Sequence, residues 1–201
     1  DYILPPATTI ADAIRAAGGL TPDAYVFGTE FSRESVRLTQ QDNYDRALRD
    51  LEVEFARVTT TQRALSADEA QAQAGRASAA TQLIERLRAI RPTGRVVLQL
   101  DVAAQSLPDL TVESGDRLYI PAKPTSVGVF GSVYNGGSYL WGGERRVMDY
   151  VQLAGGPTRG ADDGGLFVVR ANGSVVSARQ RAGFFGFGGN LGDVPAFPGD
   201  T

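Results

Sequence analysis

The stretch TIADAIRAAGGLT, Thr9 to Thr21, decides the fold because the chain contains it a second time. The second copy is RVMDYVQLAGGPT, Arg146 to Thr158, and matching residues are separated by a constant 137 positions. Both copies place apolar residues at helical spacing and end in two glycines, which tolerate the positive φ that ends a helix. A constant offset indicates a duplicated structural unit. Because so short a helix cannot bury its apolar face alone, we expect strands on either side of each copy.

Strand-forming segments flank both copies. LFVVRANGSVVS, residues 166–177, has an Ala-Asn-Gly-Ser turn between two β-rich runs and predicts a hairpin. By alignment, residues 24–38 are expected to form a similar hairpin after the first helix. Residues 127–137 predict a strand that ends in a tight Asn-Gly turn before the second helix. Alternating apolar residues predict further strands at 95–101 and 110–121.

Residues 40–92 interrupt the strand pattern with two helical segments. In the first segment, five apolar residues follow heptad spacing and therefore share one seam: Tyr44, Leu48, Leu51, Phe55 and Val58. The seam either packs inside a helical pair or binds a helix of a partner. Four of its members are therefore candidate partner-binding residues: Tyr44, Leu48, Leu51 and Phe55.

A second helix is predicted to begin at a capping box of Ser66 and Glu69 and to end at Pro92. Its apolar edge is predicted to consist of Leu83, Leu87 and Ile90. We expect the two helices, each about 20 residues and about 30 Å long, to form an antiparallel hairpin that projects as an arm.

The turn at Gly115-Asp116 recurs at Gly199-Asp200, which is 84 positions later instead of 137. The offset falls by 53, and residues 40–92 number 53, so the helical arm is an insertion that only the first repeat carries. The chain is thus predicted to contain two units. These are residues 1–121, with the helical hairpin inserted at 41–92, and residues 122–201.

Each predicted unit lacks one strand that the other contains. The strand before the second helix is preceded by another strand, whereas nothing equivalent precedes the first helix. The strand that follows the Gly115-Asp116 turn has no counterpart after Gly199-Asp200. We therefore expect the first strand of unit one to lie before Asp1 and the closing strand of unit two to lie beyond Thr201.

Composition excludes several classes of function. The 201 residues include neither cysteine nor histidine, which removes thiol chemistry, Cys/His zinc sites and histidine-dependent acid–base catalysis. The 20 basic and 23 acidic residues are spread along the chain, so no basic patch for nucleic acid is visible. No apolar run reaches the roughly 18 residues that a membrane-spanning helix needs. We expect no bound metal and no cofactor.

No residue pattern indicates an enzyme. The glycine-rich residues 181–193 lack the spacing and the strand–turn–helix context of a phosphate-binding loop. Glu30 with Glu34, and Asp162 with Asp163, are acidic pairs, but glycoside hydrolysis needs two carboxylates that converge across a sugar. Exposed loop charge explains these pairs more simply.

Aromatic residues surround the Asn-Gly-Gly sequence at 135–137, and arginines follow closely. Aromatic rings and guanidinium groups can stack on sugar rings or contact a partner protein. The simpler interpretation is that alternate residues form the core of a hairpin. The candidate ligand-binding residues are Tyr134, Asn135, Tyr139, Trp141 and Arg145.

Taken together, the helix stops AAGG and LAGG, the hairpin GSVYNGGSYL at 131–140 and the closures GDRLYIP and PGDT resemble the SLBB domains of outer-membrane polysaccharide export proteins. SLBB stands for soluble ligand-binding β-grasp. AAGGLTPDAYVFGTEFSRESVR, followed by a helical insertion and RPTGRVVL, is similar to capsule-export members that carry such an arm. The resemblance implies an α+β fold of two tandem β-grasp units, the first with an inserted antiparallel helical hairpin.

The resemblance also implies a function. It points to a non-enzymatic, periplasmic module of a capsular polysaccharide export protein that acts in oligomer assembly and in translocation across the outer membrane. The implied partners are further copies in a ring, the polysaccharide and an inner-membrane export component, with no nucleic acid. Outer-membrane association is expected through parts outside this chain. The alternative is a module that binds a glycan or a small soluble ligand.

Overall fold

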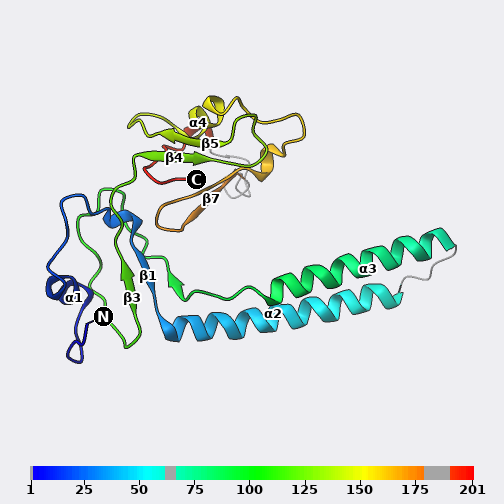
Figure 1. Cartoon of the computed structure of the whole chain (residues 1–201), viewed down its shortest axis with the longest axis horizontal. Helices are drawn as coiled ribbons and strands as arrows, with labels where there is room; N and C mark the ends of the chain where they lie inside the picture. Colours follow the sequence, from blue (N-terminus) through cyan, green and yellow to red (C-terminus); the bar gives the residue numbers. More distant parts are fainter. Residues whose placement is uncertain (1, 62–66, 179–190) are drawn as a thin grey trace, which may run out of the picture. The chain divides into compact units, whose positions relative to one another are not determined.

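The structure is a computed structural model that describes residues 2–61, 67–178 and 191–201 (Figure 1). The chain forms two compact units, one of Asp1–Phe31 with Val97–Thr201 and one of Ser32–Val96. The helices are α1 (Ile10–Ala16), α2 (Glu34–Thr61), α3 (Ala67–Arg88) and α4 (Val147–Leu153). The strands are β1 (Glu30–Ser32), β2 (Arg95–Val96), β3 (Arg117–Tyr119), β4 (Ser126–Val129), β5 (Gly137–Leu140), β6 (Phe167–Val169) and β7 (Val175–Ser177). The predicted α+β class is confirmed.

Helices α1 and α4 are the two copies of the repeated helix, and an aspartate caps the start of each. At α1, the hydroxyl of Thr9 accepts from the backbone N–H of Asp12, and the Asp12 carboxylate accepts from the backbone N–H of Thr9, both at 3.3 Å. The Thr9 hydroxyl also donates to the Asp12 carboxylate, and this bond together with the one from the Thr9 backbone N–H holds the pKa of Asp12 below its ordinary value. At α4, the Asp149 carboxylate accepts from the backbone N–H of Arg146 at 2.7 Å. Thr9 and Asp12 thus form a reciprocal capping box at the start of α1.

Both helices end at their glycine pairs. The four glycines have φ between +79° and +103°, which residues with a side chain rarely adopt. The second glycine of each pair donates back into its helix, Gly19 to the carbonyl of Ile14 and Gly156 to that of Val151, each at 2.9 Å. The predicted helix stops are confirmed, and the same hydrogen bond recurs 137 residues later.

The hydrogen bond that anchors the first residue of each repeated helix shows both sequence offsets, 137 and 84. The first residue of α1, Ile10, donates its backbone N–H to Leu110 at 2.8 Å. The first residue of α4, Val147, donates to Val194 at 2.9 Å. The two donors are 137 positions apart, whereas the two acceptors are only 84 apart. The difference of 53 equals the length of the helical insertion that the second repeat lacks, so the same backbone pairing is kept with and without the arm.

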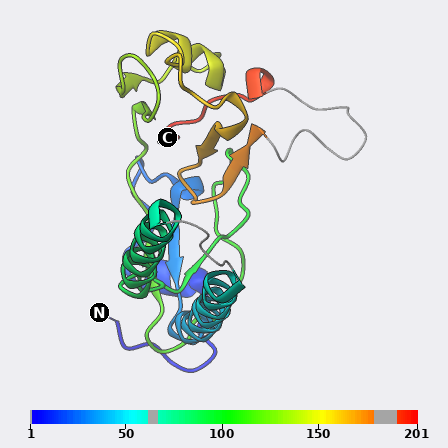
Figure 2. The ribbon, with the colours of Figure 1, turned by 90° about the vertical axis from the view of Figure 1, so that its right-hand side faces the viewer.

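The strands form three small sheets. Their orders are β2-β1-β3, β4-β5 and β6-β7, and the last two pairs are antiparallel. Figure 2 shows β6 and β7 side by side in orange. Strands β1 and β6 are equivalent, and their central residues Phe31 and Val168 are both buried. Beyond β7, β6 also pairs through Val169 with the backbone of Thr201.

In the first repeat, the helical arm of α2 and α3 replaces the short turn that joins β6 and β7 in the second repeat. In the second repeat, Arg170 donates its backbone N–H to Ser174 at 2.8 Å and closes the turn between β6 and β7. At the equivalent point of the first repeat, Arg33 donates to Gly94 at 3.0 Å, and α2 and α3 lie between these two residues. The hairpin predicted at 24–38 is therefore wrong. This copy lacks the Asn-Gly turn, and an acidic residue in the first turn of α2, Glu34, favours a helix start.

Two further strand predictions are wrong in detail. The Asn-Gly sequence at 135–136 does not form a tight turn, because the connection between β4 and β5 bonds instead to the end of α4. Asn135 donates its backbone N–H to Ala154 at 2.8 Å, and Val133 pairs with Pro157. The strand predicted at 95–101 is limited to β2, and Gln99, three residues after its end, has a φ of +31° that does not fit an extended strand.

Helices α2 and α3 form the predicted antiparallel hairpin (Figure 1). With 28 and 22 residues, they are about 42 and 33 Å long at about 1.5 Å per residue. Within the seam of α2, Leu48 is buried, and the Tyr44 hydroxyl donates to the carbonyl of Leu87 in α3 at 2.8 Å. The side chain of Val58 and the predicted cap Ser66 lie outside the described residues.

The apolar edge predicted for α3 is only partly correct. Leu87 is half-buried, but Leu83 is 49% exposed and Ile90 is 52% exposed. Among the α3 side chains that the structure describes, the half-buried ones are Ala77, Ala80, Ile84 and Leu87. Their spacing of three and four places them on one stripe. Small alanines on this stripe escaped prediction because they carry little apolar signal.

Gly94 lies at the base of the arm, where the chain returns from α3 to Arg33, and a side chain there should destabilise the fold. Its φ is +73°, and a Cβ there would lie 2.5 Å from the carbonyl oxygen of Arg33 and 2.8 Å from the Cβ of Arg37. Gly94→Ala is expected to lower the free energy of unfolding by about 2 to 4 kcal/mol, through strain and overpacking. Urea unfolding followed by far-UV circular dichroism measures it.

The matched control is Gly75→Ala in α3, where a Cβ meets no atom within 4 Å. This change is expected to stabilise the helix by about 0.5 to 1 kcal/mol. Equal effects of the two substitutions would contradict the assignment of Gly94 as the residue that closes the arm.

Candidate functional site

Three of the predicted ligand-binding residues lie in the β4–β5 connection or in β5 itself. Tyr134 is 66% exposed, and its backbone N–H donates to Gly156 at 3.3 Å. Tyr139 is half-buried against the core, and its hydroxyl donates to the carbonyl of Asn135 at 2.5 Å. Tyr139 thus uses both its ring and its hydroxyl inside the fold, whereas Tyr134 presents its ring to solvent.

Trp141 follows β5 directly and is also held by the fold. Its indole N–H donates to the carbonyl of Ala196 at 2.9 Å, and its ring packs against the core of the second repeat. The ammonium nitrogen of Lys123 lies over this ring, 5.3 Å from the centroid. This distance falls within the range of a cation–π contact.

Arg145 lies over a second aromatic ring. Its guanidinium carbon is 5.9 Å from the ring centroid of Tyr150, a buried residue of α4. The Tyr150 hydroxyl accepts from the backbone N–H of Gly142 at 2.7 Å and donates to the carbonyl of Leu140 at 3.4 Å. The exposed guanidinium therefore rests on a fixed aromatic base.

These contacts divide the five candidates into two groups. Tyr134, Asn135 and Tyr139 surround the β4–β5 connection, while Trp141 and Arg145 flank the Gly142-Gly143 turn. Sequence reasoning missed Lys123 and Tyr150, which complete the second group. Lys123 is the chain's single lysine, but its 18-residue separation from Trp141 hides the contact. Whether either group binds a ligand stays a prediction.

On the arm, an open groove runs between α2 and α3. Phe55 lines it from the predicted seam, opposite Ala77 and Ala80 of α3. On its rim, Arg88 donates to Glu52 of the facing helix at 2.6 Å and to Glu85 at 2.8 Å. The seam is thus engaged inside the hairpin at Tyr44 and Leu48 and borders an open surface at Phe55.

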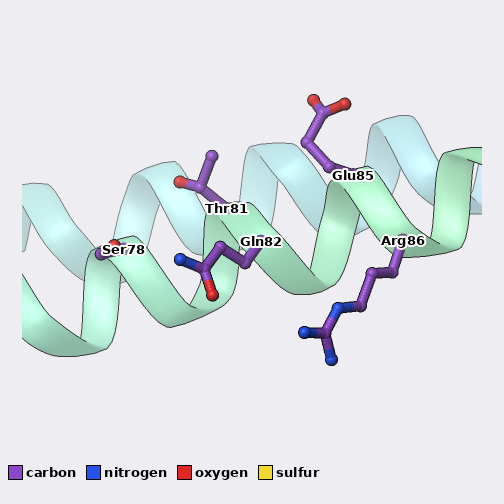
Figure 3. A pocket seen from close by; sticks show the side chains of 5 residues that line it. All are labelled: Ser78, Thr81, Gln82, Glu85 and Arg86. Atoms are coloured by element: carbon purple, nitrogen blue, oxygen red, sulfur yellow. The ribbon is translucent and has the colours of Figure 1, made fainter.

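A second hollow lies on α3 alone. Figure 3 shows that its five polar side chains fan out from one helix and do not converge on a common point. The lining residues are Ser78, Thr81, Gln82, Glu85 and Arg86. Convergence is what a small-molecule site requires, so this surface is not a candidate for one.

A buried ion pair is the feature that sequence reasoning missed most completely. Arg170 and Asp200 are 8% and 1% exposed, and the guanidinium donates to Asp200 Oδ2. The same oxygen accepts from the backbone N–H of Phe197 at 2.7 Å, and Arg170 also donates to the carbonyl of Pro195 at 2.9 Å. The Arg170 guanidinium carbon lies 4.3 Å from the ring centroid of Phe197.

The repeat itself contains a signal for this pair. An arginine also stands 137 positions before Arg170, at Arg33, and an aspartate stands 84 positions before Asp200, at Asp116. The recurring aspartate has the same turn role in both copies, since Asp116 accepts from the backbone N–H of Glu113 as Asp200 does from Phe197. The two offsets therefore single out both residues in the sequence, but not their pairing.

Residues of the first repeat approach this ion pair. Tyr25 is buried, and its hydroxyl has no hydrogen-bond partner in the described part of the chain. Burial raises the pKa of Tyr25 to about 12, and the charge of Asp200 adds to the increase. Phe27 meets the ring of Phe197 edge-on, with centroids 5.9 Å apart. The pair therefore lies where the two repeats pack against each other.

Two classes of feature are not found within residues 2–61, 67–178 and 191–201. No three or more acidic side chains gather there in a way that could hold a metal ion. No helix there is both long and apolar enough to cross a membrane.

Comparison with known proteins identifies the repeated segments. Residues 2–34 and 126–178 match the SLBB domain family. The first SLBB stretch contains α1 and β1 and ends where α2 begins, and the second contains β4 to β7 and α4. All five predicted ligand-binding residues lie in the second stretch, whereas the arm lies outside both.

The chain is also similar to two polysialic acid transport proteins, both named KpsD, from Escherichia coli. The sequences are 25% identical over 148 residues. The alignment covers 74% of this chain and 25% of each relative, so the chain corresponds to about a quarter of those proteins. The resemblance to SLBB domains of capsule-export proteins is confirmed at this level.

Proposed function

We propose that this chain is a periplasmic module of a protein that exports capsular polysaccharide or exopolysaccharide across the outer membrane. The observation that carries the proposal is the pair of SLBB stretches in a chain that is similar to polysialic acid transport proteins. The proposed role is non-enzymatic, which agrees with the transport function in the relatives' name. The division into units 1–121 and 122–201 remains part of the proposal.

The proposed partners are further copies of the chain in a ring, the exported polysaccharide and an inner-membrane export component. The arm is the proposed contact for a protein partner, because the second repeat closes the same position with only a turn. Of the predicted partner-binding residues, Phe55 is the one that borders an open groove. Tyr44, Leu48 and Leu51 would support that surface from inside the hairpin.

The chain offers its own replacement for the arm, which makes the proposal testable. Residues 34–94 are replaced by Ala-Asn-Gly-Ser, the turn that follows Arg170 in the second repeat. Because Arg33 and Arg170 close equivalent positions, β1 and β2 should remain paired. We expect the full-length exporter with this graft to fold but to lose export of polysaccharide to the cell surface.

Two measurements on the grafted protein separate loss of folding from loss of export. Thermal unfolding of the 201-residue chain and of its grafted form tests whether the remaining unit stays folded. Surface polysaccharide, quantified in cells that carry each full-length version, tests export. Normal export by a folded graft would refute the role of the arm, and failure of the unaltered full-length protein to support export would refute the proposed function itself.

A further inference from the structure

Lys123 and Arg145 are exposed cations that lack an acidic partner anywhere in the part of the chain that the structure describes. The neighbouring Arg146, in contrast, is paired with Asp193 at 2.5 Å. Each unpaired cation lies over an aromatic ring, Lys123 over Trp141 and Arg145 over Tyr150. Two positive charges are thus held against aromatic surfaces with their hydrogen-bond donors available.

One hydrogen-bonded frame positions the two rings. The indole of Trp141 is tied to the carbonyl of Ala196, whose own backbone N–H donates to the carbonyl of Arg145 at 3.1 Å. The Tyr150 hydroxyl is tied to Gly142, the residue after Trp141. Each ring is therefore held in place by a hydrogen bond, which reduces the entropy lost when a ligand binds.

The turn between Trp141 and Arg145 contains two glycines, which have no side chains. A Cβ on Gly143 would lie 3.5 Å from the Trp141 ring, and a Cβ on Gly142 would lie 3.5 Å from the Cδ of Arg145. Larger residues would cover the ring edge and the arginine stem. The two glycines leave both accessible.

Lys123 reaches this place from the connection between the repeats. Its backbone N–H donates to the carbonyl of Asp23 at 2.9 Å, and the preceding Ala122 pairs with Ala24. Both repeats therefore determine the position of the ammonium group.

We propose that Lys123, Trp141 and Arg145 form a contact site for an acidic glycan. The ammonium and guanidinium groups would donate to sugar carboxylates, and the C–H face of a sugar ring would pack against the part of the half-buried indole that remains accessible. The inference rests on the proposed export role and deepens it, because it names the side chains that would contact a carboxylate-bearing polymer. Tyr134, Asn135 and Tyr139 are not required.

Nearby carboxylates make the electrostatic basis testable. Asp149 is engaged at the start of α4, but Glu144 is exposed and directly precedes Arg145. A negative charge beside the site should weaken the binding of a polyanion. Glu144→Gln is therefore expected to increase the affinity for an acidic glycan several-fold.

Trp141 is the only tryptophan, so its fluorescence reports directly on the site. The 201-residue chain is titrated with a sialic acid oligomer, a galacturonic acid oligomer and a neutral glucose oligomer of equal length. We expect a saturable change with both acidic oligomers, weakened by salt, and none with the neutral one. Lys123→Gln and Arg145→Gln should each raise the dissociation constant about tenfold.

The matched control is Arg49→Gln on α2, an exposed arginine in the other compact unit, which should bind like the unaltered chain. The inference would be overturned if neutral and acidic oligomers bound equally well, or if no fluorescence change occurred at millimolar concentration. It would also be overturned if Arg49→Gln lost as much affinity as the site variants. A response to only one acidic oligomer would refute the class-wide claim.

Export in cells separates this inference from the proposed function. Full-length protein with Lys123→Gln and Arg145→Gln is compared with unaltered protein in a host that makes an acidic capsule. Undiminished export by the double variant would refute the glycan site and leave the export role standing. Absence of export by the unaltered protein would refute the export role, whatever the titration shows.

Discussion

Replacing Arg170 with methionine is expected to lower the free energy of unfolding by about 3 to 5 kcal/mol at neutral pH. The substitution keeps most of the side-chain volume but leaves the Asp200 carboxylate, which is 1% exposed, without its counter-charge. The second carboxylate oxygen, Oδ1, already has no hydrogen-bond partner among the described residues. The remaining bond from Phe197 cannot offset a buried charge.

The loss should depend on pH in a defined direction. Burial raises the pKa of Asp200 above its ordinary 3.8, although Phe197 and Arg170 act to lower it. The folded protein therefore holds this proton more tightly than the unfolded chain. The stability that Asp200 contributes is complete below the ordinary pKa and is lost as the pH rises through the raised value.

Without Arg170, the pKa of Asp200 should rise further, because the cation that favours the carboxylate is gone. The folded variant then takes up a proton on acidification, and the cost of the substitution should shrink as the pH falls toward the ordinary pKa of Asp200, 3.8. Urea unfolding followed by Trp141 fluorescence, repeated across this pH range, measures the change. A cost that grows on acidification would contradict the assignment.

Two control replacements test whether the unpaired charge causes the loss predicted for the Arg170 replacement. Arg15→Ala breaks the exposed pair with Asp12, whose side chains are 77% and 47% exposed, and should cost no more than about 1 kcal/mol. The double replacement of Arg170 by methionine and Asp200 by leucine removes both charges and should recover most of the lost stability. If the single and double replacements cost the same, lost packing and not the unpaired charge is responsible.

Replacing Tyr150 with alanine should have a comparable effect, a loss of about 3 to 5 kcal/mol. Tyr150 is 1% exposed and lies in the core of the second repeat with Val127, Val147 and Val168. Its removal opens a cavity beneath Arg145. Urea unfolding followed by Trp141 fluorescence measures the loss.

Tyr150→Phe separates the ring from the hydroxyl. The ring beneath Arg145 remains, but the backbone N–H of Gly142 loses its acceptor, which should cost about 1 kcal/mol. Tyr134→Ala removes a ring that is 66% exposed and should change stability by no more than about 0.5 kcal/mol. A loss in Tyr134→Ala as large as that in Tyr150→Ala would contradict the described core.

Features that depend on neighbouring residues were predictable from the sequence. The cap at Thr9 and the glycine stops follow from backbone geometry over a few residues, and the structure has both. Predictions failed where tertiary contacts override local preference. The Asn-Gly sequence at 135–136 is a strong turn signal, yet its backbone bonds to the end of α4.

The residues of the candidate site also include some that the sequence predicted and some that it did not. The aromatic and arginine residues between Tyr134 and Arg145 were found because they cluster along the chain. Lys123 was missed because only folding brings it to Trp141. On the arm, heptad spacing predicted the seam through Leu48, but the alanines of α3 that face it carry too little apolar signal to be distinguished from exposed ones.

By itself, the sequence determined that this protein has two copies of one unit and that one copy carries an arm. Two offsets within a single chain suffice for that conclusion, because repeated units keep their internal spacing. Only the tertiary structure decided that Arg170 and Asp200 are buried together and that Lys123 stands over Trp141. Burial and distance depend on residues far apart in the chain, and no local pattern encodes them.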